Sequence, residues 1–91
     1  PMPSVDVTMQ AAARNFGART VGVLLTGMGS DGAEGLLAIR RAGGLTIVQD
    51  QATCTIFGMP RAAIERGAAQ RVLPLDEIAG AVHEAVEGRQ T

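Results

Sequence analysis

The sequence feature that most constrains the fold is an aliphatic run at residues 21–25, which leads directly into a glycine-rich turn. The run reads Val-Gly-Val-Leu-Leu, a pattern typical of a strand covered on both faces in a parallel sheet. Gly27, Gly29 and Gly32 then permit a sharp change of chain direction, and Asp31 stands within this turn. Because open α/β sheets build their sites at the carboxyl ends of strands, this turn is the first candidate for a functional site.

The rest of the chain predicts helices that alternate with short strands. Apolar spacing, a capping Ser4 and the positions of glycine and proline predict helices at residues 5–16, 33–42, 60–66 and from 75 onward, and strands at 21–25, 45–49 and 71–73. This order implies right-handed parallel crossovers, and therefore an α/β fold with three layers and a doubly wound, mostly parallel sheet. Three parallel strands are too few for the burial that their sequences require, above all for the first strand, whose pattern predicts neighbours on both sides. We therefore expect residues 1–91 to form the carboxyl-terminal half of a larger domain.

Composition excludes several classes of function. The net charge is -1, and the arginines are scattered without interleaved aromatic residues, which argues against a nucleic-acid partner. No apolar run approaches the roughly 18 residues that a membrane span requires. Cys54 is the single cysteine, which fits a reducing cytoplasm, and no group of residues has metal-ligand spacing. We expect no metal, cofactor or membrane insertion.

The residues of the turn allow three interpretations. Gly27, Gly29 and Gly32 have the G-x-G-x-x-G spacing of a dinucleotide site, and Asp50 is placed to hold a ribose. Asp31 argues against this site, because its charge would compete with a pyrophosphate at the helix start. A second interpretation makes Asp31 only the N-cap of the following helix, with Glu34 completing a capping box. A third is a structural fragment without any site.

Three segments carry a resemblance to one family. Residues 25–33, LTGMGSDGA, resemble the T-G-M-G-x-D-G-A signature of the chemotaxis protein-glutamate methylesterases. Residues 51–63, QATCTIFGMPRAA, are similar to a second stretch of that family, Q-x-x-[ST/C]-x-V-[FY]-G-M-P-x-x-A. Residues 3–7, PSVDV, resemble the segment P-S-V-D-x. The three matches follow the order of the family and cover nearly the whole chain.

The resemblance implies a cytoplasmic hydrolase of two-component chemotaxis signalling. Such an enzyme hydrolyses glutamate methyl esters on the cytoplasmic domain of chemoreceptors, often also deamidates glutamines, and follows a phosphorylated receiver domain. It uses a serine, a histidine and an aspartate in that chain order, and Asp31 falls at the aspartate. The resemblance also implies that the backbone N–H of Met28 helps to hold the oxyanion of the reacting ester.

The chain departs from the family by lacking the G-x-S-x-G-G turn that carries the nucleophile. Ser30 has no neighbouring base, and no histidine is placed to activate Cys54. His83 lies off the apolar stripe of its helix and four residues before Glu87, so we expect a solvated side chain. We therefore expect this chain to be inactive alone. We also expect it to associate with itself through the exposed edge of its first strand.

Overall fold

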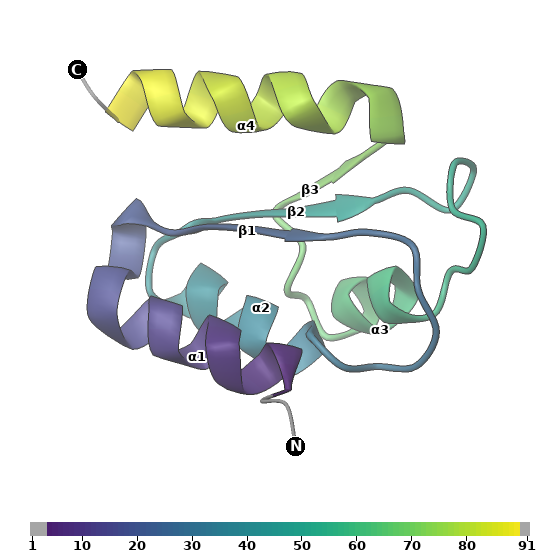
Figure 1. The fold of residues 1–91 in the computed structure, drawn as a ribbon, viewed down its shortest axis with the longest axis horizontal. Coiled ribbons are helices and arrows are strands. Elements are labelled where there is room, and N and C mark those ends of the chain that lie inside the picture. The colour runs from purple at the N-terminus through teal and green to yellow at the C-terminus, as the bar shows by residue number, and fades with distance from the viewer. Residues whose placement is uncertain (1–3, 90–91) are drawn as a thin grey trace.

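The computed structural model describes residues 4–89 and contains one parallel sheet (Figure 1). Its three strands lie in the order β1-β2-β3. Their bounds are β1 Val21–Leu24, β2 Leu45–Gln49 and β3 Arg71–Leu73. The predicted strands are thus confirmed, except that the first ends one residue earlier. In the described part of the chain β1 pairs only with β2, so its outer edge is unpaired.

Helices cover both faces of the sheet (Figure 1). They are α1 Val5–Phe16, α2 Ala33–Arg41, α3 Met59–Glu65 and α4 Leu75–Arg89, with the short 3-10 turn η1 Gly17–Arg19 after α1. The first three lie against one face, and α4 lies against the other. The predicted three-layer α/β architecture is therefore confirmed. No helix within residues 4–89 has the length and apolarity needed to cross a membrane.

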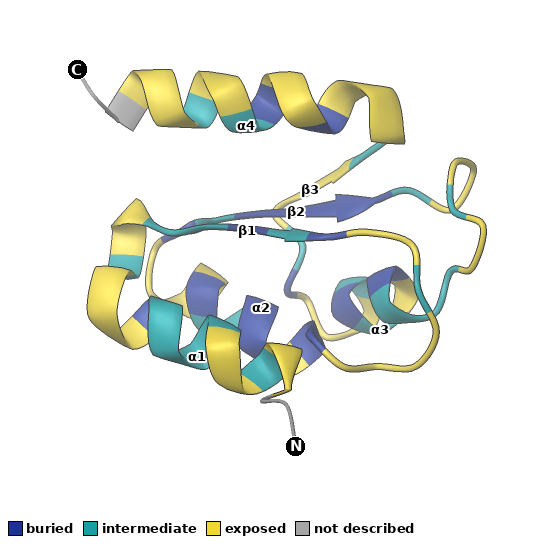
Figure 2. Ribbon diagram, viewed as in Figure 1, coloured by how far each residue is buried: buried dark blue, intermediate teal, exposed yellow. Residues whose placement is uncertain are grey.

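The core is divided between the two faces of β2 (Figure 2). Val48 packs on one side with Leu36 and Ile39 of α2, and all three are almost fully buried. Ile47 faces the other way and contacts Ile78 and other apolar residues of α4. This alternation is expected for a central strand, whose successive side chains point to opposite faces.

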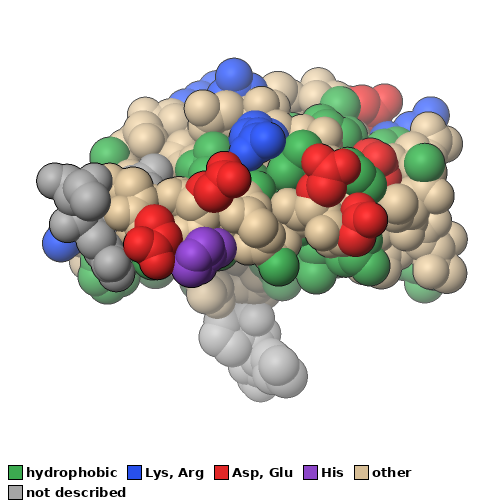
Figure 3. Space-filling view, turned by 90° about the horizontal axis from the view of Figure 1, so that it is seen from above, with side chains coloured by type: hydrophobic (Ala, Val, Ile, Leu, Met, Phe, Trp, Pro, Cys, Tyr) green, Lys and Arg blue, Asp and Glu red, His purple; other side chains and the backbone are tan. Residues whose placement is uncertain are grey.

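The outer face of α4 is polar and acidic. It carries Asp76 and Glu77 in its first turn, and Figure 3 shows acidic side chains spread over this face. His83 lies there with its Nε2 atom 3.5 Å from Oε1 of Glu87. Both side chains are largely exposed, which confirms the predicted solvated histidine.

Helices α1 and α2 cross closely at Gly35. A Cβ atom at this position would lie 2.6 Å from Cβ of Met9 and 3.0 Å from Cα of Asp6. Only glycine therefore lets the start of α2 come this near to the backbone of α1.

This crossing generates a prediction that uses two helical glycines. Replacing Gly35 by alanine should lower the free energy of unfolding by about 1–3 kcal/mol, because the added methyl group overpacks a close contact. Replacing Gly80 in α4, where a Cβ would meet nothing within 4 Å, should raise it by about 0.5–1 kcal/mol. Denaturant unfolding of both variants at one protein concentration measures the difference. A stabilising Gly35→Ala change would contradict the close crossing.

Candidate active site

The turn that follows β1 is fastened to the loop before α3. The Oγ1 hydroxyl of Thr26 donates a hydrogen bond to the carbonyl of Ile56 (3.0 Å) and accepts one from its N–H (2.8 Å). The N–H of Gly27 donates to the same carbonyl at 3.0 Å. The carbonyl of Gly27 in turn accepts the N–H groups of Gly58 and Met59 at 3.1 and 2.9 Å. The two segments, thirty residues apart in sequence, thus form one hydrogen-bonded unit.

Gln49 joins this unit to the sheet. Its side chain is 1% exposed. Its amide oxygen accepts the N–H of Thr26 at 2.8 Å, and its amide nitrogen donates to the carbonyl of Thr53 at 2.8 Å. Sequence reasoning missed this residue, although a long polar side chain at the end of a buried, mainly apolar strand was a usable signal. Gln49 therefore positions the turn from the end of the neighbouring strand β2.

Met28 lies at the exposed part of the turn. Its residue is 75% exposed, and Leu25 and Ile56 form further exposed apolar surface nearby along the two segments. No acceptor within residues 4–89 takes the backbone N–H of Met28. An N–H in this state is available to an oxygen atom of a bound molecule.

The carboxylate of Asp31 caps α1, the helix that precedes β1. Its Oδ2 atom accepts the N–H of Val5 at 3.1 Å, and Oδ1 lies 3.4 Å from the N–H of Asp6. Figure 1 shows the start of α1 beside the start of α2. The interpretation of Asp31 as the N-cap of α2 is therefore wrong. Gly32, with φ of 101°, holds the N-cap position instead and places Asp31 outside the helix.

The predicted capping box with Glu34 is absent for the same reason. Glu34 is exposed and forms an ion pair with Arg66, at the end of α3. The start of α2 is capped by Asp6, whose Oδ1 atom accepts the N–H groups of Gly32 (3.0 Å) and Gly35 (2.8 Å). Sequence reasoning did not single out this role of Asp6, because the two segments are far apart along the chain.

The capping by Asp6 also weighs against a dinucleotide site. A pyrophosphate at the glycine turn needs the free N–H groups at the start of α2, and a carboxylate already occupies two of them. The other expected ligand, Asp50, accepts the N–H and the hydroxyl of Thr53 at 3.0 and 2.7 Å. Neither half of the fingerprint is arranged for a nucleotide.

The remaining candidate nucleophiles have no base beside them. Ser30 is exposed in the same turn as Asp31, while the single histidine of the sequence lies on α4, across the sheet. Partial burial raises the pKa of the Cys54 thiol; a hydrogen bond with Thr26 opposes this, and the charge of Asp50 raises the pKa further. Cys54 is thus held as a neutral thiol. Among residues 4–89, no group of three His, Cys, Asp or Glu side chains is placed to hold a metal ion.

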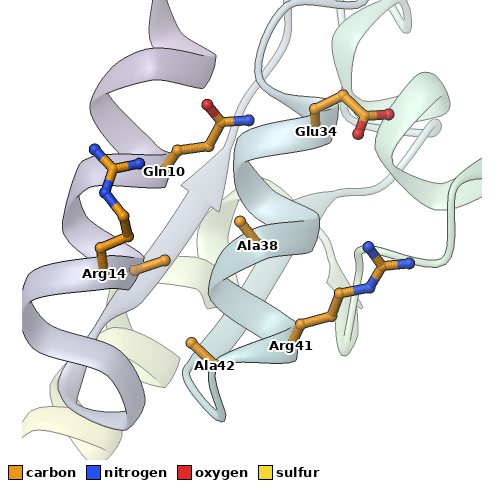
Figure 4. A pocket seen from close by; sticks show the side chains of 7 residues that line it. Gln10, Arg14, Glu34, Ala38, Arg41 and Ala42 are labelled. Atoms are coloured by element: carbon orange, nitrogen blue, oxygen red, sulfur yellow. The ribbon is translucent and has the colours of Figure 1, made fainter.

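A groove of about 540 Å³ lies away from the turn, between α1 and α2 (Figure 4). Gln10 and Arg14 of α1 line it opposite Ala38 and Arg41 of α2. It is shallow and open, and none of its lining residues belongs to the turn that holds Met28 and Asp31.

Comparison with known proteins identifies the family. The family model described as CheB methylesterase matches residues 1–82. The protein-glutamate methylesterase/protein-glutamine glutaminase 2 of Pseudomonas aeruginosa is 59% identical over 80 residues, which are 88% of this chain and 23% of that protein. The corresponding protein of Pyrococcus horikoshii is 54% identical over 85 residues, covering 93% of this chain and 23% of its own length.

A solved structure has the same fold. The CheB methylesterase catalytic domain of Thermotoga maritima is 41% identical and superposes with a TM-score of 0.83, over 93% of this chain and 43% of that domain. The chain belongs to the CheB methylesterase family. It spans less than a quarter of the length of these two curated relatives.

The state of Cys54 generates a prediction about its reactivity. A raised pKa leaves a smaller fraction of thiolate at any given pH, and thiolate is the species that is alkylated. Iodoacetamide at pH 8 should therefore modify Cys54 more slowly in the folded chain than in the chain unfolded in denaturant, after correction with a small-thiol standard. Faster modification of the folded chain would indicate an activated thiol.

Proposed function

We propose that this chain forms the carboxyl-terminal part of the catalytic domain of a protein-glutamate methylesterase, with residues 1–91 as one partial domain. It supplies the aspartate of a serine-histidine-aspartate triad and one wall of the site. The observation that carries this proposal is that one turn, within the segment matched by the family, holds both the exposed carboxylate of Asp31 and a Met28 N–H that takes no acceptor within residues 4–89. The serine and the histidine come from the part of the protein that this sequence does not contain.

The exposure and the free lone pairs of Asp31 support a role in orienting an imidazole. A carboxylate offers about four lone-pair positions, of which the start of α1 uses one on each oxygen of Asp31. The residue is exposed, so the remaining positions are accessible to the Nδ1–H of a histidine. The carboxylate then fixes the tautomer and stabilises the imidazolium that forms when the serine attacks.

The backbone N–H of Met28 is proposed to stabilise the oxyanion. As the serine oxygen adds to the ester carbonyl, negative charge develops on the carbonyl oxygen, and a fixed N–H lowers its energy. The hydrogen bonds of Thr26 and Gly27 to Ile56 hold this turn before the substrate arrives. Removal of one such donor costs about 100- to 1000-fold in turnover in other enzymes.

The substrates and partners follow from the same proposal. The substrate is a glutamate methyl ester on the cytoplasmic domain of a chemoreceptor, and a glutamine side chain is a second substrate for deamidation. The names of the relatives, which include both activities, support this assignment. The protein acts in the cytoplasm within two-component signalling, with a receiver domain upstream that is phosphorylated.

The test uses a chimera of the Pseudomonas aeruginosa relative in which this chain replaces the matched 80-residue segment. The chimera should hydrolyse methylated receptor. Asp31→Asn should lower kcat about 10,000-fold, because the amide cannot hold the required tautomer of the histidine. Receptor affinity should change little, since the receptor contacts a broader surface than one carboxylate. Methanol release and receptor binding measure the two effects.

The stability of the fold serves as the control, because Asn keeps an oxygen that can accept the N–H of Val5. Asp31→Asn should therefore unfold at nearly the same denaturant concentration as the unchanged chimera. A folded variant with near-normal hydrolysis would overturn the triad assignment. A folded chimera that is inactive with Asp31 in place would overturn the proposed function.

The unpaired edge of β1 carries a second prediction for the chain alone. An edge without a partner strand, as β1 has within residues 4–89, presents N–H and C=O groups to other chains, here beside the partly exposed Val21 and Val23. We propose that isolated chains associate through this edge. Light scattering at tens of micromolar should give a mass above that of the monomer, and the mass should fall on dilution. A monomer over the whole concentration range would contradict the proposal.

A further inference from the structure

We propose that Asp6 is a positioning residue for Asp31, acting through the start of α1. This inference rests on the proposed function, in which Asp31 must hold a histidine. It concerns a residue that need not touch substrate or the reacting atoms. The observation behind it is a pair of carboxylates that cap two neighbouring helices. Asp6, in α1, caps the start of α2, and Asp31, just before α2, caps the start of α1.

The carboxylate of Asp31 is held by the start of α1, which lies outside the turn that contains Asp31. The turn contains Gly29 and Gly32 with φ values of 84° and 101°, and Ser30 accepts only a long hydrogen bond of 3.3 Å from Ala33. Such a turn has few means of fixing a side chain by itself. The N–H groups at the start of α1 supply the fixed points on the carboxylate of Asp31.

The second carboxylate, that of Asp6, fixes the start of α1. Asp6 is half-buried, and its Oδ1 atom accepts the N–H groups of Gly32 and Gly35 at 3.0 and 2.8 Å. Gly32 directly follows Asp31 in the chain, and Gly35 lies in the first turn of α2. The backbone N–H of Asp6 lies 3.4 Å from Oδ1 of Asp31, a longer contact than the 3.1 Å hydrogen bond from Val5, and with it the two caps close a loop between the helices. Displacement of either helix start would break both caps.

This loop of hydrogen bonds matters for catalysis because it fixes the position of Asp31. A triad carboxylate must be held within about 0.5 Å of its productive position. A displacement of about 1 Å costs on the order of 100-fold in rate. Without the carboxylate of Asp6, the packing of the helices at Gly35 would remain, but the hydrogen bonds between the two helix starts would be reduced to those that Asp31 accepts.

The experiment compares Asp6→Ala and Asp6→Asn in the chimera described above. Asp6→Ala removes the acceptor for both N–H groups and should lower kcat by up to about 100-fold, the loss expected for a displacement of about 1 Å. KM should stay unchanged, because Asp6 is not proposed to contact substrate. Asp6→Asn keeps an oxygen at the same place and should restore most of kcat. Rates are expressed per folded molecule, from the unfolding curve of each variant.

Ser4→Ala is the matched control. It removes the hydrogen bond from the N–H of Val7 to Oγ of Ser4 at the same helix start, but leaves both carboxylates in place. Its kcat per folded molecule should equal that of the unchanged chimera. If Asp6→Ala does not fold, Asp6→Ser replaces it, because the shorter hydroxyl cannot reach both N–H groups; the same loss of kcat is expected.

The outcomes separate this inference from the proposed function. A folded Asp6→Ala or Asp6→Ser variant with normal kcat overturns the positioning role, even if Asp31→Asn is inactive. Equal losses for Ser4→Ala and Asp6→Ala also overturn it, because any loosening of α1 would then suffice. Near-normal hydrolysis by Asp31→Asn overturns the proposed function itself.

Discussion

The close crossing of α1 and α2 is the contact on which the candidate site depends. Gly35 allows the two backbones to approach, and this approach brings Asp6 and Asp31 within reach of each other's helices. The helix dipoles contribute in the same sense, because each carboxylate lies at the positive end of a helix. A larger residue at the crossing would separate the helices and leave both carboxylates without these N–H groups.

The sheet also helps to fix the turn, on the side away from α1. Parallel pairing resumes beyond the strand ends as an isolated bridge between Gly27 and Phe57. The turn that carries Met28 is therefore an extension of the hydrogen-bonded framework. A preorganised N–H group is what oxyanion stabilisation requires, because its orientation then costs nothing at the moment of reaction.

Much of the fold could be predicted from the sequence, because its signals are local. The aliphatic run at 21–25, the helical spacing after Ser4 and the glycines at helix ends each act within a few residues. The cap of α2 was predicted wrongly because the left-handed Gly32 starts the helix one residue after Asp31. The capping of α2 by Asp6 was not predictable by such local rules, because Asp6 and Gly35 are separated by 29 positions in the sequence. The family resemblance singled out Asp31 as a candidate, and this stays a prediction, but it said nothing of what holds the side chain.

The burial of Gln49 sets a requirement that is stricter than size or polarity. Its amide faces an N–H on one side and a carbonyl on the other, so one end must be an acceptor and the other a donor. Glutamate has the same shape but offers two acceptors, which would set an oxygen of the buried side chain against the carbonyl of Thr53. Leucine would fill the space and leave both partners unsatisfied. Among side chains of this length, only glutamine provides an acceptor oxygen and a donor nitrogen together. The two ends of its amide group thus distinguish the two loops, because the oxygen pairs with the N–H of one loop and the nitrogen with the carbonyl of the other.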